Sequence, residues 1–383
     1  MKKNLDLSSS LYLGIFFFIL IFPKAGFKLG SIPISLGYVF LGLYSLYSIF
    51  RFRFEPSKES ALFLLAWIPF QIVIVIHFIF YPPQDIGYFI SLVVNFIFFP
   101  YLFYGLFPKH SSQDFLIYFI KYLRMSIFLV CLYGIVLFFY KIIFGEFLEI
   151  PGLTSNFSDY GTLEETKFID RGGIYKLIST YGNGNLFGIC IMFFYPLFLT
   201  YEPSILRRWT CRIALVLTLS RTIWIGLIIA EIIHLFILPK IKKTISVALL
   251  LLMIFSANRF MESFQDKNNF LLDASLGGRD EQLHVFNNLT FIGAGGFDGI
   301  YEMVFLGILK SFGVLGLFTF TFAAIFPLIY SLFKPNTIIQ KQLLIGIFLY
   351  GILSISDGAI LLIPVMYFYY FSNNLVIYYI NKI

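Results

Sequence analysis

Apolar runs long enough to cross a membrane recur along this chain, and short connections with proline or charge separate them. Two such connections, Tyr81-Pro-Pro-Gln-Asp85 and Lys334-Pro-Asn336, are typical turn sequences. Because a transmembrane helix needs about 20 predominantly apolar residues, the pattern predicts an all-α polytopic integral membrane protein. We expect about twelve transmembrane helices, at residues 10–23, 31–50, 61–80, 86–107, 115–143, 184–201, 204–220, 221–238, 244–257, 312–333, 342–356 and 359–380.

The composition agrees with this class and excludes an ordinary soluble domain. Hydrophobic residues make up 59% of the 383 residues and charged residues only 13%, with a mean hydropathy of +0.85. No stretch is long and polar enough for a separate soluble domain, so we expect a single membrane domain over residues 1–383. Cys131, Cys190 and Cys211 lie in apolar segments at unrelated spacings, which favours core packing over a disulfide framework or a zinc site.

The basic residues predict the orientation in the membrane. Lys and Arg, which give the net charge of +7, concentrate in a few short connections, as expected beside an anionic inner leaflet and not for nucleic-acid binding. This bias predicts that both termini are cytoplasmic and that two long loops, 144–183 and 258–311, lie on the outer face. Loops of this length are usually functional. Within the second loop, residues 301–311 are predicted to form a helix along the outer interface.

Arg221 lies in the apolar run Leu215-Val-Leu-Thr-Leu-Ser-Arg-Thr-Ile-Trp-Ile-Gly-Leu227. A charge at bilayer depth costs at least about 2.5–3.5 kcal/mol, so such residues are usually kept for function. One long span would put one of the flanking basic clusters outside, whereas a hairpin of helices 204–220 and 221–238 keeps both inside. We therefore expect Arg221 at the outer tip of a hairpin, as an anion contact or, alternatively, as a snorkelling or turn residue. The clusters are Arg207, Arg208 and Arg212 before the run and Lys240, Lys242 and Lys243 after it.

Arginine recurs beside glycine or polar turn residues in the segments expected on the outer face. The cases are Arg171-Gly-Gly173, Ser220-Arg221-Thr222 and Gly278-Arg279-Asp280. The planar guanidinium binds phosphate oxygens in pairs, so several arginines around one outer site suit a pyrophosphate. For each arginine alone, a salt bridge with a neighbouring acid is the alternative. The sequence has no Gly-x-x-x-x-Gly-Lys-Ser/Thr loop, no Ser/His/Asp set and no His-x-x-x-His pair, so we expect no cofactor and no metal.

Four short segments stand out along the chain. They are Tyr181-Gly-Asn-Gly-Asn-Leu-Phe-Gly188, Leu217-Thr-Leu-Ser-Arg-Thr-Ile-Trp224, Gly278-Arg279, and Ile292-Gly-Ala-Gly-Gly296 followed by Glu302 and Phe312-Gly-Val-Leu-Gly316. In this order they resemble the O-antigen polymerase and O-antigen ligase superfamily of polytopic membrane glycosyltransferases. The resemblance covers roughly residues 165–330, and the remaining spans resemble the family by hydropathy only.

The resemblance implies a GT-C-type enzyme of the bacterial cytoplasmic (inner) membrane, with its active site on the periplasmic or extracellular face. Such polymerases move a glycan from undecaprenyl pyrophosphate onto the terminal sugar of an incoming lipid-linked repeat, as for lipopolysaccharide O-antigen or capsule. Donor and acceptor are then both undecaprenyl-pyrophosphate-linked oligosaccharides. Membrane lipids are further expected partners, as are a chain-length regulator and a flippase, and no nucleic acid is expected.

By the same resemblance, Arg221 and Arg279 would hold the donor pyrophosphate and stabilise it as leaving group of an inverting displacement. Glu302 is the first candidate for the base, followed by His284 or Asp280. Further contacts to pyrophosphate or glycan would come from Arg171, Arg259 and Asn185.

Two alternatives to a polymerase stay open. Ligases of the family carry a His-Asn pair after the glycine cluster, where this chain has Gly299-Ile-Tyr-Glu302, and that departure favours a polymerase over a ligase. A polysaccharide flippase is the second alternative. It would be expected to show internal repeats around midplane charges, and no repeat between the halves is visible.

Overall fold

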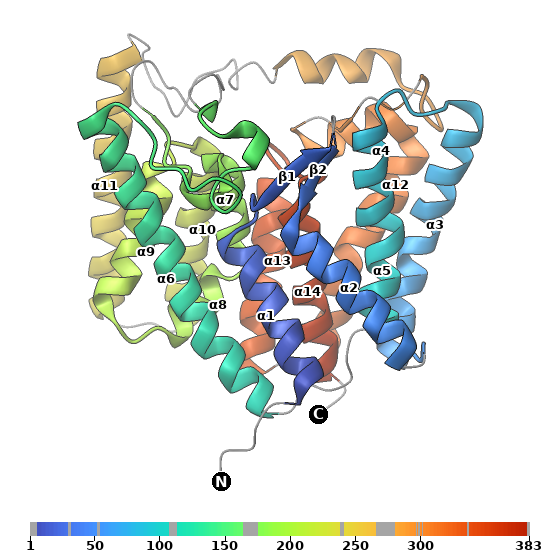
Figure 1. The fold of residues 1–383 in the computed structure, drawn as a ribbon, viewed down its shortest axis with the longest axis horizontal. Coiled ribbons are helices and arrows are strands. Elements are labelled where there is room, and N and C mark those ends of the chain that lie inside the picture. The colour runs from blue at the N-terminus through green and yellow to red at the C-terminus, as the bar shows by residue number, and fades with distance from the viewer. Residues whose placement is uncertain are drawn as a thin grey trace. The chain divides into compact units, whose positions relative to one another are not determined.

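A computed structural model of the chain describes residues 6–29, 32–51, 54–106, 113–163, 175–237, 241–265, 280–295, 297, 299–300, 302–334 and 337–380. Over these residues the protein is all-α, with fourteen α-helices and one short hairpin of two strands (Figure 1). The helices and strands are α1 (Leu7–Ile21), β1 (Gly26–Leu29), β2 (Ile32–Ser35), α2 (Leu36–Arg51), α3 (Lys58–Phe80), α4 (Ile86–Val93), α5 (Phe99–Tyr101), α6 (Gln113–Phe144), α7 (Gly184–Met192), α8 (Tyr195–Tyr201), α9 (Ile205–Leu217), α10 (Arg221–Ile237), α11 (Ile241–Gln265), α12 (Val304–Leu332), α13 (Ile338–Leu353) and α14 (Ile363–Ile380).

Short π-helical and 3-10 segments lie between some of these helices. Two π-helical segments, η1 (Val94–Phe98) and η2 (Leu102–Leu106), continue α4 and α5 into one apolar rod. Three 3-10 helices, η3 (Phe157–Asp159), η5 (Ser179–Tyr181) and η7 (Asp280–Asn288), lie in the two long connections.

The chain divides into two compact units, each of which is described by itself. Unit 1 contains Met1–Leu41 and Ser112–Ala274, and unit 2 contains Gly42–Ser111 and Ser275–Ile383.

Several helices are long and apolar enough to cross a membrane, but far fewer than the twelve predicted. In the described residues four qualify: Lys58–Phe80, Ile86–Leu106, Asp114–Phe144 and Val304–Leu332. A fifth would be the pair of α7 and α8, which are bent by 57° at the break between them. The number twelve is therefore wrong. Most of the predicted segments do form helices, but several are short, such as the 13-residue α9, which at 1.5 Å per residue is only about 20 Å long.

Unit 1 is built around the long helix α6. It packs against α1, α8 and α9, and Phe16, Phe119 and Phe194 meet edge to face between α1, α6 and the start of α8. The hairpin pairs Gly26 with Ser35 in antiparallel register, and Lys28 of β1 forms an ion pair with Asp159 of η3. The sequence did not predict these strands, since the expected span 31–50 begins where β2 lies.

Unit 2 has an aromatic core between α3 and α12. Trp67 and Phe70 of α3 contact Phe96 of η1 and Phe320 of α12, and all four side chains are buried. The backbone of α12 is broken at Gly313, whose φ of 68° lies in the left-handed region. This break separates residues 304–312 from the rest of α12. Val304–Leu332 as a whole is long and apolar enough for one span, and the interfacial helix expected at residues 301–311 stays a prediction.

Candidate functional site

Arg221 begins α10, directly after a tight turn that follows α9. The turn is closed by a hydrogen bond from the Leu219 N–H to the Val216 carbonyl, at 3.1 Å. Leu219 itself has a positive φ of 48°, a conformation that costs a non-glycine residue about 1–3 kcal/mol. The indole Nε1–H of Trp224 donates back to the same Val216 carbonyl at 2.9 Å and joins the two helices. Two helices therefore meet at a turn beside Arg221, as predicted, and Arg221 is half-buried. Neither α9 nor α10 is among the helices long and apolar enough to cross a membrane, so the position of this turn at the outer face stays a prediction.

A second helix begins beside this turn. Asn183 caps α7 with its side-chain oxygen, which accepts hydrogen bonds from the N–H groups of Asn185 and Leu186 at 2.8 and 3.3 Å. The preceding loop is held to the end of α9 by a hydrogen bond from the Leu177 N–H to the Leu217 carbonyl, at 2.9 Å. The segment that resembles the family's asparagine-rich motif thus starts next to the segment that contains Arg221.

Glycines allow α7 and α10 to approach closely. A Cβ atom on Gly184 would lie 2.7 Å from the Leu177 carbonyl oxygen and 3.3 Å from that of Thr218, and one on Gly188 would lie 2.5 Å from Ile223. Gly184 lies next to Thr218 and Gly188 next to Ile223, so the N-termini of α7 and α10 lie at the same end. Helix N-termini carry partial positive charge, so two of them side by side favour an anion.

The side chains at this place add positive charge and polar groups. Lys176 is buried in the loop, and its Cβ lies 3.3 Å from the position of a Gly184 Cβ. Thr180 is buried as well, and its hydroxyl has no hydrogen-bond partner among the described residues. We call Lys176, Asn185 and Arg221, together with the first turns of α7 and α10, the α7–α10 site. Asn185 and Arg221 were predicted from the sequence, whereas Lys176 was missed.

Of the other predicted arginines, only Arg259 is among the described residues. Arg259 is exposed on α11, where its guanidinium lies 5.3 Å from the centre of the Phe255 ring. Arg171 lies outside the described residues, as does Arg279. The meeting of Arg221 and Arg279 in one site therefore stays a prediction.

The predicted base candidates belong to unit 2. Asp280 begins η7, but its side chain lies outside the described part. His284 is exposed on η7 and its Nδ1 lies 3.4 Å from the side-chain amide nitrogen of Asn287. Glu302 is exposed just before α12, and its main-chain carbonyl accepts a hydrogen bond from the Gly358 N–H at 3.0 Å. The neighbour of Gly358 is Asp357, a buried carboxylate that the sequence prediction did not single out.

Gly293 and Gly313, in two of the glycine-rich segments, serve close backbone packing. A Cβ atom on Gly293 would lie 2.2 Å from the Ser311 carbonyl oxygen, and one on Gly313 would lie 2.4 Å from the Gly293 nitrogen. The N–H groups of Val314 and Leu315, freed by the break in α12, donate to the carbonyls of Thr290 and Phe291 at 3.0 Å each. Two of the family-like segments are thus brought together, and the observed geometry is that of a tight turn.

Two ion-pair networks in unit 1 were not predicted. In the first, Arg212 of α9 binds Glu231 of α10 at 2.7 and 3.0 Å and the Ser246 hydroxyl of α11 at 2.7 Å. The Tyr195 hydroxyl donates to the same carboxylate. Arg212 and Glu231 are only 5% and 2% exposed, so Arg212 is a buried ion-pair partner and not part of a solvated basic cluster.

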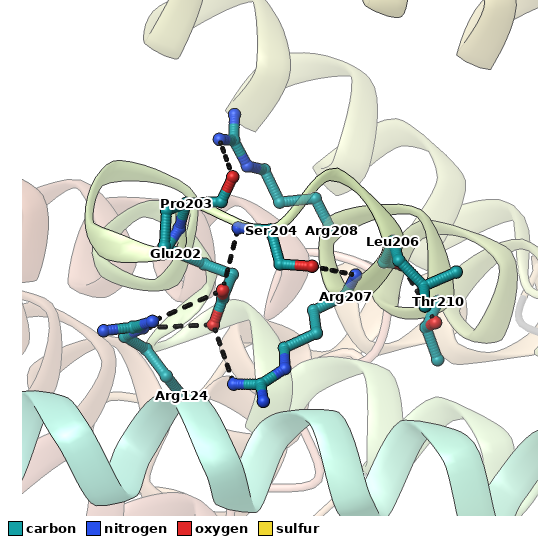
Figure 2. A network of polar contacts seen from close by, with 8 residues as sticks. All are labelled: Arg124, Glu202, Pro203, Ser204, Leu206, Arg207, Arg208 and Thr210. Carbon is teal, nitrogen blue, oxygen red and sulfur yellow. Dashed lines mark hydrogen bonds and ion pairs between the residues drawn. The ribbon is translucent and has the colours of Figure 1, made fainter.

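The second network surrounds Glu202 at the end of α8 (Figure 2). Its carboxylate accepts hydrogen bonds from Arg124 at 3.0 and 3.4 Å and lies 3.7 Å from the guanidinium of Arg207. Burial alone would raise the pKa of Glu202, but the hydrogen bonds from Arg124 and from the Ser204 N–H and the two positive charges outweigh it and lower that pKa. Glu202 is therefore held ionised.

Comparisons with known proteins give no relative for this chain: no family model, no curated protein and no solved structure matches it.

Proposed function

We propose that this protein is a polymerase of lipid-linked polysaccharide repeat units. It would transfer a growing glycan from undecaprenyl pyrophosphate to the terminal sugar of an incoming undecaprenyl-pyrophosphate-linked repeat. Several of its helices are long and apolar enough to be membrane spans, which suits substrates anchored in a membrane. The observation that carries the proposal is the α7–α10 site, where two helix N-termini meet at Arg221.

A diphosphate suits the α7–α10 site for three reasons. Its negative charge is favoured by the partial positive charge at the N-termini of α7 and α10. The guanidinium of Arg221 can bind two oxygens at once, and Lys176 adds a second cation from the loop. The site also lies at the expected outer tip of the hairpin, where no nucleotide is available and a lipid pyrophosphate is an activated donor.

The proposed reaction is an inverting displacement. The hydroxyl oxygen of the acceptor sugar attacks the anomeric carbon of the donor, and the bond from that carbon to the pyrophosphate oxygen breaks. The hydroxyl proton passes to a base, and undecaprenyl pyrophosphate leaves with the bonding electron pair. Arg221, with Arg279 as predicted from the resemblance, stabilises the charge that develops on the leaving group. Glu302, His284 and Asp280 are the base candidates from the resemblance.

Variants of Arg221 in the producing cell test this proposal. Arg221→Ala and Arg221→Lys are compared with Arg51→Ala, which removes an exposed arginine at the end of α2. Loss of one such leaving-group contact lowers turnover by about 10²–10³-fold, and Lys keeps the charge without the two-pronged contact. We expect single-repeat products from both Arg221 variants, with lipid-linked repeats still reaching the outer leaflet, and full-length chains from Arg51→Ala.

Other outcomes contradict the proposal and identify the alternatives. Repeats that accumulate on the cytoplasmic side in the Arg221 variants indicate a flippase. Long chains that stay on the lipid carrier indicate a ligase acting on lipid A core or on protein.

A further inference from the structure

Three arginines lie near Glu202, and two of them pair with its carboxylate. Arg124 comes from α6, and Arg207 and Arg208 come from the first turn of α9 (Figure 2). Arg124 and Arg207 both pair with Glu202, whose side chain is fully buried. Arg208 turns the other way and donates from Nη2 to the Pro203 carbonyl at 3.2 Å. We call Arg124, Glu202, Arg207 and Arg208 the Glu202 cluster.

The Glu202 cluster has more positive charge and more donors than its own carboxylate can satisfy. The Glu202 carboxylate pairs with two of the three guanidinium groups, each of which has five N–H donors, and the third, of Arg208, points away from it (Figure 2). The Nε of Arg208 is buried and has no hydrogen-bond partner in the described residues. The first turn of α9 adds the partial positive charge of a helix N-terminus. An anion with several oxygens would use these donors, and a phosphate group fits them best.

The surroundings of the cluster are those of a membrane boundary. In α6 no charged residue lies between Arg124 and Lys141, and residues 125–140 extend over about 24 Å at 1.5 Å per residue. Arg124 therefore lies at one edge of a stretch nearly as long as the hydrocarbon layer is thick. Ile205 and Leu206, directly before the two arginines of α9, are 70% and 73% exposed, as expected for side chains in contact with lipid.

Aromatic rings lie next to two of the basic side chains in this region. The guanidinium of Arg207 lies 5.2 Å from the centre of the Phe128 ring, and the Lys121 ammonium lies 5.7 Å from that of Tyr122. Basic and aromatic residues next to exposed apolar ones are typical of the interface between lipid headgroups and acyl chains. The exposed apolar side chains would contribute nothing to the binding of a soluble phosphate.

We propose that the Glu202 cluster is a binding site for the phosphate of an anionic lipid headgroup. Glu202 holds Arg124 and Arg207 in place without neutralising the cluster, and Arg207 and Arg208 supply the free donors. The predicted topology puts the cluster on the cytoplasmic side, where anionic lipids are attracted to basic residues close to the membrane surface. This role is independent of the glycan chemistry at the α7–α10 site.

Trp209 provides a direct test, because it follows Arg208 and is half-buried, whereas Trp67 and Trp224 are fully buried. The full chain is placed in vesicles of equal parts phosphatidylglycerol and phosphatidylcholine. Bromine atoms, which quench tryptophan fluorescence, are carried by the acyl chains of one lipid or of the other. We expect stronger quenching when phosphatidylglycerol carries the bromine. Arg207→Gln/Arg208→Gln should reduce this preference for phosphatidylglycerol over phosphatidylcholine by about fivefold for each arginine removed.

Lys334→Gln/Lys341→Gln is the matched control, since it removes two exposed cations of unit 2 and should leave the preference unchanged. High salt should weaken the preference in the wild type, which tests the proposal without any substitution. The proposal is overturned by equal quenching from both lipids in the wild type or by a preference that survives in the arginine variant. Inorganic phosphate at millimolar concentration should have no effect; if it abolishes the preference, the ligand is a soluble phosphate and not a lipid.

Discussion

Arg212 and Glu231 form a buried ion pair that fastens α9 to α10. The Arg212 guanidinium also donates a hydrogen bond to the Ser246 hydroxyl, and it lies 5.0 Å from the centre of the Trp209 ring. Buried ion pairs gain little net stability because both charges lose their hydration, but removing one partner leaves the other charge uncompensated. This pair therefore sets which faces of the two helices meet, and through them where α10 begins with Arg221.

We predict that Arg212→Met lowers the free energy of unfolding by about 3–5 kcal/mol, because Glu231 stays buried without its partner. Arg212→Met/Glu231→Gln should recover part of this loss, since Gln carries no charge and still accepts the hydrogen bond from Tyr195. Thermal unfolding in detergent measures both variants, with the exposed Arg51→Met as control. Additive effects of the two substitutions would contradict a coupled pair.

The residues of the site differ in how far the sequence could predict them. Arg221 was predictable because a single charge interrupts an apolar run, and that pattern has few structural explanations. Asp357 shows the same signal, in the apolar stretch between α13 and α14, and could have been found in the same way. The partners of Glu202 and Glu231 were not predictable, because they lie on other helices and the sequence contains no information on which helix faces meet.

The helices are interrupted at a few places, and one of these interruptions, the turn at Leu219, borders the α7–α10 site. The break between α7 and α8 has a sequence signal in Pro196, which lacks an N–H group and is favoured in the first turn of a helix. The turn at Leu219 has no such signal, since leucine rarely adopts a positive φ. Its position was nevertheless predicted, from the distribution of charge and not from turn propensity.

Gly184 tests the arrangement of these elements. We predict that Gly184→Ala displaces the loop before α7, because the added Cβ would lie 2.7 Å from a main-chain oxygen, and that transfer activity falls at least tenfold. Gly351→Ala in α13 is the matched control, since a Cβ there meets nothing within 4 Å. It should preserve activity and add about 0.5–1 kcal/mol of stability, because alanine favours the helix. Equal activity of the two variants, measured by product length, would argue against the α7–α10 site.

For the whole molecule, the class was predictable and the number of spans was not. Apolar runs, charged turns and composition correctly predicted a helical protein with helices long enough to cross a membrane. Counting runs gave too many spans, because hydropathy does not distinguish a full span from a short or bent helix such as α9 or the pair of α7 and α8. We found no sequence pattern that predicts the two strands or the division into two compact units.

The topology can be tested with single cysteines, because the three native cysteines are buried. We predict that Tyr160→Cys, in the first long connection, reacts with a membrane-impermeant maleimide in intact cells. Lys58→Cys, at the start of α3, should react only after the membrane is permeabilised. Both positions are exposed, so accessibility depends on the side of the membrane. The reverse labelling pattern would invert the orientation and place the tip of the α9–α10 hairpin in the cytoplasm.

The central claim is that Arg221, at the α7–α10 site, stabilises pyrophosphate as the leaving group of glycan transfer. The most direct measurement uses purified protein with undecaprenyl-pyrophosphate-linked repeat units, scored by product length and by released undecaprenyl pyrophosphate. We predict a ladder of products with one carrier released for each repeat added, and a loss of about 10²–10³-fold for Arg221→Ala. Chain growth that proceeds equally well in Arg221→Ala, or repeats that stay unjoined with the wild-type protein, would contradict the claim.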